Sequence, residues 1–439
     1  MTTADPSRCL GLRARGRDPL IQNSAYLMAA TIVTSLVGYL FWTVAAHLYS
    51  ASAIGEAGAG VSAMAFASLL GAMGGSMAIL AELPGKQRPA DWSATITASL
   101  VFTCATSAAT ALVTVLVLAQ TGHSAFLYRN AWWVAAFVVG VVATTASQLL
   151  ENIWLAEHKA VWFLGASTVF ALVKLAIIAI PVFAVFGATG IVSAWSATLA
   201  ATVAGCLLVL GRMFGYRPRL AGFSGQIWSM RQSLTGNYII SVGDQVTLYA
   251  IPVLVALQVS PQATGWFYVA WKIGGFYAVF ASAVGTSTFA EGSHSPHRAL
   301  PMAWSGLRMI LPLMALGAAV TIFAGHLVLR VFGTQYAVHA YPLLVLLSLA
   351  AFPDAVVTIY RGVLRVQKRY RAAAGMCWAI SGCRLALTAL ALVHWGITGA
   401  GWAWLATQTG GAAWCALDLA WHRRSSTREP AQAVKEESP

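Results

Sequence analysis

Four charged side chains stand near the middle of long apolar stretches in this sequence. Lys174, Lys272 and Arg384 are basic, and Asp244 is acidic. An ionised group in the hydrocarbon core of a membrane is costly, so such residues usually face a cavity or one another. If all four face one cavity, three positive charges and one negative charge leave about +2, which would attract a phosphate or pyrophosphate group.

The same residues also permit a structural interpretation. Asp244 would then pair with Lys272 or Arg384 as an ion pair within the second half of the chain, because buried charges are usually paired. One or two cations remain unmatched in that case. Asp244 is also a candidate site for a coupling ion, either a proton or sodium.

A second charged group lies closer to the expected cytoplasmic side and consists of Glu151, Arg308 and Asp354. These residues are candidates for gating ion pairs that hold the inner mouth of a transport path shut. The alternative is that they are helix-end charges that reach the membrane interface or nearby basic loops.

No motif in the sequence predicts an enzyme. We find no P-loop and no nucleophile elbow in a strand-to-helix setting, and we expect no cofactor. His294 and His297 form an H-x-x-H pair in an expected cytoplasmic loop, but no further ligand lies nearby in the sequence. The sequence therefore predicts no metal site.

The composition indicates that membrane-spanning helices position these residues. Hydrophobic residues make up 58% of the chain and charged residues 9%, with a mean hydropathy of +0.70, whereas soluble domains carry about 25% charged residues. The net charge of +13 does not indicate a nucleic-acid partner, because the basic residues lie in alternate loops between apolar stretches.

The apolar pattern predicts an all-α polytopic membrane protein with about twelve transmembrane helices in two six-helix lobes around a central cavity. The expected spans are 22–47, 54–80, 93–119, 131–156, 160–186, 189–211, 233–258, 262–289, 302–324, 337–360, 372–394 and 398–421. With a cytoplasmic N-terminus, only Arg129 and Arg330 fall in outer loops. This asymmetry predicts a protein of the cell membrane, the inner membrane of bacteria, with both termini in the cytoplasm.

The loops divide the chain into parts. We expect a basic cytoplasmic tail over 1–20, an N-terminal lobe over 21–211, a cytoplasmic linker over 212–232, a C-terminal lobe over 233–421 and a disordered cytoplasmic tail over 422–439. A shift of about 210 residues also aligns identical residues of the two lobes, namely Gln22, Tyr39, Ala46, Ser50, Ala53, Gly55, Phe66 and Gly75 with Gln232, Tyr249, Ala256, Ser260, Ala263, Gly265, Phe276 and Gly285. Two lobes of similar plan with a substrate site between them are a known transporter design.

The first two spans resemble the multidrug/oligosaccharidyl-lipid/polysaccharide (MOP) exporter superfamily. The similar residues are Asn23–Tyr26, at the start of the first helix, and Leu48–Gly60 (LYSASAIGEAGAG), a short turn into a helix that starts with a small residue, Gly and Glu. Within the superfamily the chain is most similar to the polysaccharide (O-antigen-type) flippases. That branch moves polyprenyl-pyrophosphate-linked oligosaccharides across the inner membrane of bacteria.

Two departures separate the chain from other branches of the superfamily. Multidrug exporters coupled to cations are known for an acidic residue in the first helix, and residues 21–55 contain none. The peptidoglycan-precursor flippase is known for arginines in its first helices and for two further helices, and neither appears here.

The resemblance implies a substrate-binding role for Lys174, Lys272 and Arg384. It also implies a lipid-linked oligosaccharide as substrate, and a polysaccharide polymerase or glycosyltransferases as partners. The alternatives are a cation-coupled multidrug or small-metabolite exporter of the same fold, and a non-transporting membrane scaffold of a polysaccharide synthesis complex.

Overall fold

The computed structural model describes residues 19–86, 88–121, 131–157, 159–220, 222–279, 281–282, 284–285 and 299–436. The regular elements over these residues are helices. Residues 1–18 of the basic tail expected over 1–20 lie outside the described residues, as does the H-x-x-H pair of His294 and His297.

The helices follow one another in two series that correspond to the two halves of the chain. The N-terminal half contains α1 (Pro19–Leu48), α2 (Ala51–Gly71), α3 (Gly75–Glu82), η2 (Leu83–Gly85), α4 (Pro89–Thr121), α6 (Ala131–Ala156), α7 (Ala160–Ile178), η3 (Pro181–Phe186) and α8 (Gly187–Phe214). The C-terminal half contains α9 (Phe223–Gln258), α10 (Pro261–Gly274), α12 (Ala299–Arg330), α13 (Thr334–His339), α14 (Tyr341–Val366), α15 (Tyr370–Trp395) and α16 (Ile397–Glu436).

These helices confirm the predicted all-α polytopic membrane fold. In the described part of the chain, ten helices are long and apolar enough to cross a membrane. The two expected spans outside this group correspond to α10 and α16. The described helix of α10 has 14 residues, and α16 carries the polar residues Thr407, Gln408 and Thr409 in succession.

Several expected boundaries differ from the structure. The span expected over 54–80 is interrupted between α2 and α3, where Met73 and Gly74 have positive φ angles of 47° and 79°. The loop between the halves is shorter than 212–232, because α8 ends at Phe214 and α9 begins at Phe223. In the segment where we predicted a disordered tail, α16 continues as far as Glu436.

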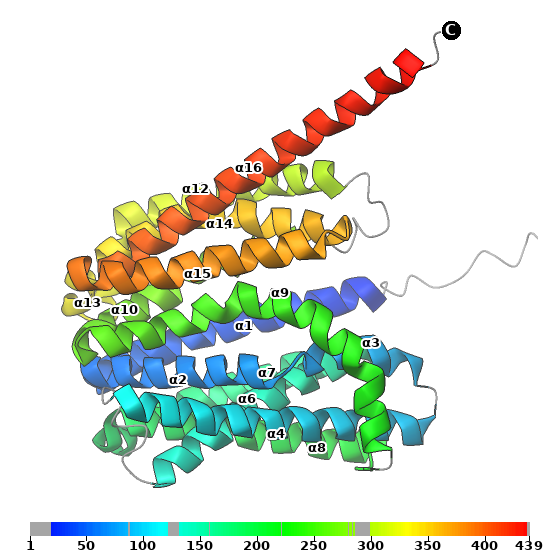
Figure 1. The fold of residues 1–439 in the computed structure, drawn as a ribbon. Helices are drawn as coiled ribbons and strands as arrows, with labels where there is room; N and C mark the ends of the chain where they lie inside the picture. Colours follow the sequence, from blue (N-terminus) through cyan, green and yellow to red (C-terminus); the bar gives the residue numbers. More distant parts are fainter. Residues whose placement is uncertain are drawn as a thin grey trace, which may run out of the picture.

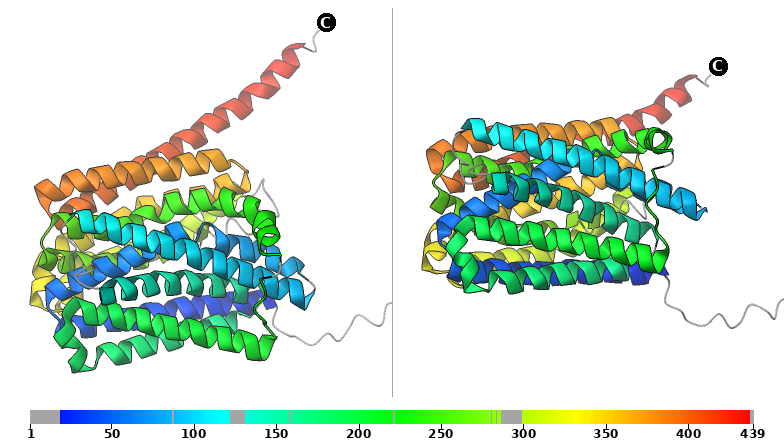
Figure 2. Two further views of the ribbon diagram at one scale, coloured as in Figure 1. Left: turned by 60° about the horizontal axis from the view of Figure 1, so that its bottom comes forward. Right: turned by 90° about the horizontal axis from the view of Figure 1, so that it is seen from below.

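The long helices lie side by side in one bundle, and α1 begins at the same end of the bundle at which α16 ends (Figures 1 and 2). The chain therefore runs along the bundle an even number of times between the start of α1 and the end of α16. Within the N-terminal half α1 packs on α7, and α6 packs on α4 and α8. Within the C-terminal half α9 packs on α15, and α14 packs on α12 and α16.

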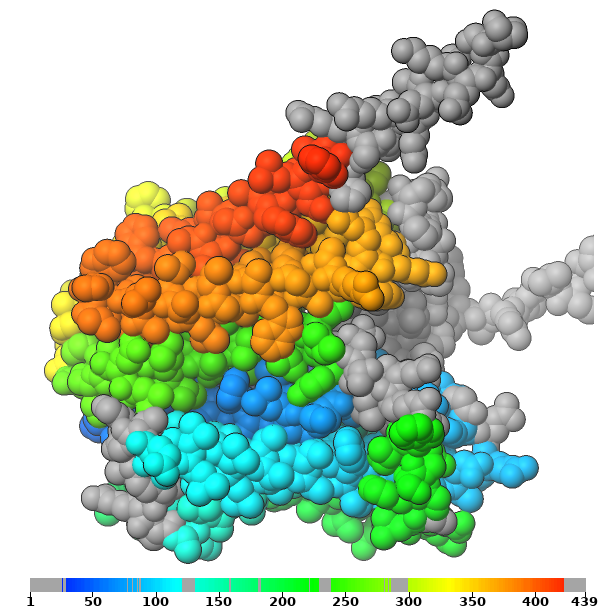
Figure 3. Space-filling view, in the orientation of Figure 1, coloured from blue at the N-terminus to red at the C-terminus, as the bar shows by residue number. Residues whose placement is uncertain are grey.

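The halves meet through α2, which packs against α9 and α10. The space-filling view shows α2 between α4 and α9 (Figure 3). Gly55 of α2 and Gly265 of α10 make this contact possible, because a Cβ on Gly55 would collide with the carbonyl oxygen of Pro261 and one on Gly265 with that of Ala51. Small residues of this kind let helix backbones approach closely in lipid.

The helices α2 and α10 occupy equivalent positions in the internal repeat that the sequence indicated, and their N-termini are capped in the same way. Ser50 caps α2 by accepting a hydrogen bond from the backbone N–H of Ala53 at 3.2 Å, and Ser260 caps α10 through Ala263 at 3.3 Å. Each cap satisfies one backbone donor at a helix N-terminus. The two helices therefore start in the same way, 210 positions apart.

A hydrogen-bonded ion pair fixes the turn between α14 and α15 to α16. Arg369 donates two parallel hydrogen bonds of 2.9 Å to the carboxylate of Asp418, which also accepts one of 2.5 Å from Tyr360. The hydrogen bonds to Asp418 raise the pKa of the Arg369 guanidinium above its ordinary value. This two-point geometry is specific to arginine and holds the C-terminal half together at one end.

Candidate functional site

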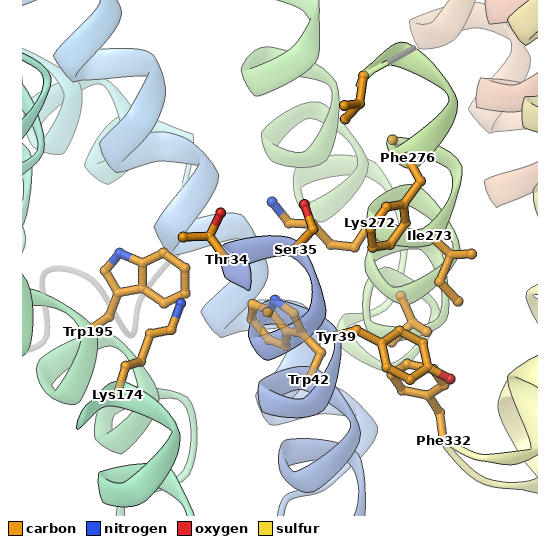
Figure 4. A pocket seen from close by; sticks show the side chains of 14 residues that line it. Thr34, Ser35, Tyr39, Trp42, Lys174, Trp195, Lys272, Ile273, Phe276 and Phe332 are labelled. Carbon is orange, nitrogen blue, oxygen red and sulfur yellow. The ribbon is translucent and has the colours of Figure 1, made fainter. Parts of the chain in front are cut away.

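A cavity of about 240 Å³ lies between the two halves and is shared by their predicted functional lysines. Its wall consists of residues from α1, α7 and α8 on one side, and from α10, the segment that follows α10 and the turn after α12 on the other. Figure 4 shows Lys174 and Lys272 on opposite sides of α1, which presents Thr34, Ser35 and Trp42 between them. None of the residues described along this wall is acidic.

Lys174 is held in the N-terminal half by aromatic rings. Its side chain is 5% exposed, and its Nζ lies 3.8 Å from the centroid of Trp195, 4.7 Å from that of Phe170 and 4.8 Å from that of Phe41. Among the described residues, no acidic side chain pairs with it. Cation–π contacts are worth about 2 kcal/mol when desolvated, so the rings stabilise the ammonium without neutralising it.

Lys272 stands on the opposite wall in the last turn of α10, where the partial negative charge of a helix C-terminus favours a cation. Its Nζ lies 5.1 Å from the ring centroid of Tyr268, and its side chain is exposed to the cavity. The two lysines repel each other. An anion placed between them would relieve that repulsion.

Aromatic residues of α1 connect the two lysines. Phe41 contacts Trp195 edge-on at a centroid distance of 5.7 Å, and Trp42 contacts Tyr268 in the same manner at 4.7 Å. Phe41 is fully buried and Trp42 is 5% exposed. Both rings are therefore fixed by packing. Through them α1 contacts Trp195 near Lys174 on one side and Tyr268 near Lys272 on the other.

Arg384 lines a different cavity, which lies inside the C-terminal half. This cavity of about 360 Å³ is formed by α9, α14, α15 and α16. The Arg384 side chain is 3% exposed, donates hydrogen bonds to Thr247 at 3.0 Å and Thr407 at 3.2 Å, and lies 3.7 Å from the ring centroid of Trp404. Of the three predicted cations, Lys174 and Lys272 therefore line one cavity and Arg384 lines another.

Asp244 forms an ion pair with Arg361 of α14. The sequence interpretation of Asp244 as an ion-pair residue expected Lys272 or Arg384 as its partner, but neither carries this contact. Arg361 went unrecognised because we assigned it to a cytoplasmic loop that began after residue 360. It lies instead within α14, which continues to Val366.

Solved structures with little sequence similarity share the fold of this chain. The lipid II flippase MurJ in an inward closed conformation aligns with a TM-score of 0.67 at 11% identity, over 91% of this chain and 87% of that one. An inward-facing MATE family multidrug resistance transporter of the MOP superfamily aligns with a TM-score of 0.69 at 13% identity, over 95% and 100%. A MATE transporter from Vibrio cholerae aligns with a TM-score of 0.63 at 15% identity, over 93% and 97%.

The chain has the fold of the MOP superfamily. The fold that the first two spans suggested is thereby confirmed. No protein-family model and no curated protein matches the sequence.

The predicted gate residues lie in three separate environments of this MOP fold. Glu151 lines a cavity within the N-terminal half, and Asp354 accepts a hydrogen bond from Gln408 inside the C-terminal half. Arg308 is exposed on α12 beside Trp304, with its guanidinium 5.3 Å from that ring. Among the described residues, no ion pair joins any two of the three.

The internal repeat contains a signal that sequence reasoning missed. Lys174 and Arg384 are 210 positions apart, the same shift that aligns Ser50 with Ser260. Each is stacked on a tryptophan of the following helix, at 3.8 Å in the first half and 3.7 Å in the second. The two cations are therefore equivalent positions of the two halves, and only the first faces the cavity between them.

Proposed function

We propose that this MOP-fold protein is a flippase that moves a polyprenyl-pyrophosphate-linked oligosaccharide across the cell membrane by alternating access, for the synthesis of a cell-surface polysaccharide. The proposal rests above all on one observation, that Lys174 and Lys272 face one cavity from opposite halves with no carboxylate along its described wall. A pyrophosphate group is the part of such a substrate that two lysines would bind.

The other residues of the cavity suit the remaining parts of this substrate. Trp195 is partly exposed and offers an aromatic surface against which a sugar ring can pack, and Thr34 and Ser35 offer hydroxyl groups. Phe276 and Val279 line the same cavity and are exposed, so the polyprenyl chain has an apolar wall to follow toward lipid. A cavity with a few polar groups in an apolar wall is typical of binding sites for small molecules.

The charge of the cavity argues against the two alternatives. A MATE structure of the same fold is described as a multidrug resistance transporter, but a cationic drug would be repelled by two lysines on a wall that has no acidic residue among those described. A non-transporting scaffold would need no cavity between its halves. Two lysines at membrane depth destabilise the protein, and binding of an anion between them would offset that cost.

Replacement of each lysine by alanine tests the proposal in cells. In Lys174→Ala and Lys272→Ala variants, polyprenyl-linked oligosaccharides should accumulate on the cytoplasmic side, with export lowered on the order of tenfold or more, because one charge-assisted hydrogen bond is worth about 1.5–3 kcal/mol. Mass spectrometry of lipid-linked sugars from cells measures the accumulation, and immunoblotting checks that protein abundance is unchanged.

Two further variants serve as controls. Lys272→Arg keeps the positive charge and should retain most export, whereas Arg371→Ala removes an exposed charge at the start of α15, remote from the cavity wall, and should behave as the unmodified protein does. Normal export by Lys272→Ala at normal abundance would reject the flippase assignment.

A further inference from the structure

A second cavity adjoins the lysine pair on the side of the N-terminal half. It measures about 360 Å³ and lies among α1, α2, α6, α7 and α8. Thr34, Lys174 and Trp195 line both this cavity and the one between the halves. A group bound at Lys174 therefore stands at the boundary of the two spaces, and a molecule extended from that point can occupy both.

Polar side chains from separate helices converge on the second cavity. Gln148 and Glu151 are one turn apart on α6, and Thr202 faces them from α8. Ser147 hydrogen-bonds to Glu151, but among the described residues no lysine or arginine forms an ion pair with this carboxylate. The carboxylate of Glu151 and the amide of Gln148 thus present hydrogen-bonding groups to a molecule in this cavity.

The equivalent cavity of the C-terminal half differs in this respect. There Asp244 is paired with Arg361, and Asp354 accepts a hydrogen bond from Gln408. Both carboxylates thus have partners within the protein. Of the two cavities, the one in the N-terminal half holds a carboxylate, Glu151, with which no lysine or arginine of the described residues forms an ion pair, whereas Asp244 in the other is paired with Arg361.

We propose that the cavity of the N-terminal half is a sugar subsite, which holds the hexose ring next to the phosphate bound at Lys174. Glu151 and Gln148 form hydrogen bonds with the ring hydroxyls, and the Trp195 ring packs against an apolar face of the sugar. This inference rests on the proposed function and adds to it the part of the glycan that the protein recognises. The volume lies within the range of about 300–1,000 Å³ that is usual for small-ligand sites.

Binding of soluble fragments tests the subsite on the purified full-length protein. Isothermal titration calorimetry compares inorganic pyrophosphate, inorganic phosphate and the 1-phosphates of glucose, galactose, mannose and N-acetylglucosamine. We expect at least one hexose 1-phosphate to bind about tenfold more tightly than inorganic phosphate, because a hydrogen bond to a charged group is worth about 1.5–3 kcal/mol. Glu151→Gln and Gln148→Ala should reduce that advantage to twofold or less and leave the affinity for phosphate unchanged.

A matched control lies on the same helix. The Asn152 side chain hydrogen-bonds to the backbone carbonyl of Gln148 and does not line the cavity, so Asn152→Ala should keep the full advantage of the sugar phosphate. Unchanged thermal unfolding in detergent establishes that the variants fold.

Two results separate the subsite from the proposed function. If pyrophosphate binds but no hexose 1-phosphate exceeds phosphate, or if Glu151→Gln keeps the advantage, the sugar subsite is wrong and the lysine site stands. If neither pyrophosphate nor phosphate binds the unmodified protein, the proposed function fails and the subsite fails with it.

Discussion

The ion pair between Asp244 and Arg361 joins α9 to α14 at the wall of the C-terminal cavity. The Asp244 side chain is 34% exposed and that of Arg361 13%, so water screens the pair only in part. Loss of either partner leaves the other charge without its counter-ion, which is more costly than loss of both.

A double-mutant cycle measures this coupling. We expect Asp244→Asn and Arg361→Gln to destabilise the protein individually, and the double variant to lose less than the sum, with a coupling free energy of about 0.5–3 kcal/mol. Unfolding in detergent followed by tryptophan fluorescence gives the four values. Strictly additive losses would mean that the ion pair contributes nothing to stability.

At this scale the sequence predicts residue types better than partners. Charge within an apolar span was sufficient to select Lys174 and Lys272, which share a cavity. Asp354 and Arg361 are two helical turns apart and both line the C-terminal cavity, but this relation becomes visible only once α14 is known to extend past residue 360. Arg308 and Asp354 carry similar sequence signals and lie in unlike surroundings, since helix rotation is set by tertiary packing.

The crossing of α2 and α10 is the element in which the two halves touch most closely. Gly55 and Gly265 each face a backbone carbonyl of the other helix, so neither has room for a methyl group. Thr264, beside Gly55, is 1% exposed. Alternating access requires the two halves to separate at one end and then at the other, and this crossing is the contact that would have to open at the end where α2 and α10 begin.

We expect Gly55→Ala or Gly265→Ala to shift the protein toward the form in which this end is open. The added methyl group collides with backbone atoms, which cannot move aside as a side chain can. A cysteine introduced as Thr264→Cys, after replacement of the six native cysteines, should react severalfold faster with a membrane-impermeant maleimide when either glycine is replaced.

The matched control for this prediction is Gly205→Ala in α8, where an added Cβ meets nothing within 4 Å. Its labelling rate should equal that of the Thr264→Cys protein without a glycine change. Equal rates for Gly55→Ala and Gly205→Ala would show that the crossing does not close this end.

Element boundaries were predictable where hydropathy and turn residues agree, as at α1, α6 and α15, whose ends lie within a few residues of the expected spans. The break between α2 and α3 was not, because Met73 and Gly74 lie in an uninterrupted apolar run. A left-handed conformation at a methionine costs energy that only the surrounding packing can compensate. The repeat, by contrast, is visible in the sequence and is matched by the helix caps of α2 and α10.

The whole molecule has two equivalent halves with unlike interiors. The cavity between the halves is lined by two lysines. The cavity of the N-terminal half holds the carboxylate of Glu151, which has no cationic partner among the described residues. In the cavity of the C-terminal half, Asp244 is paired with Arg361, and Arg384 donates hydrogen bonds to threonines. Under the proposed function the lysines stay near the middle of the membrane while the halves rock. The net charge that crosses the bilayer is then the charge of the substrate.

A membrane potential should therefore drive the transport of a pyrophosphate-linked substrate. Two negative charges that leave an interior at negative potential gain about 2.3 kcal/mol each per 100 mV, or roughly 4.6 kcal/mol in total. In proteoliposomes, a potassium gradient with valinomycin sets the potential, and a fluorescent polyprenyl-pyrophosphate sugar reports flipping by its accessibility to a quencher. We expect the potential that makes the donor side negative to raise the extent of transport, and the opposite potential to lower it. If the extent of transport does not change with the potential, cations must move together with the substrate. The charge of the substrate would then be balanced by those cations and not by the two lysines.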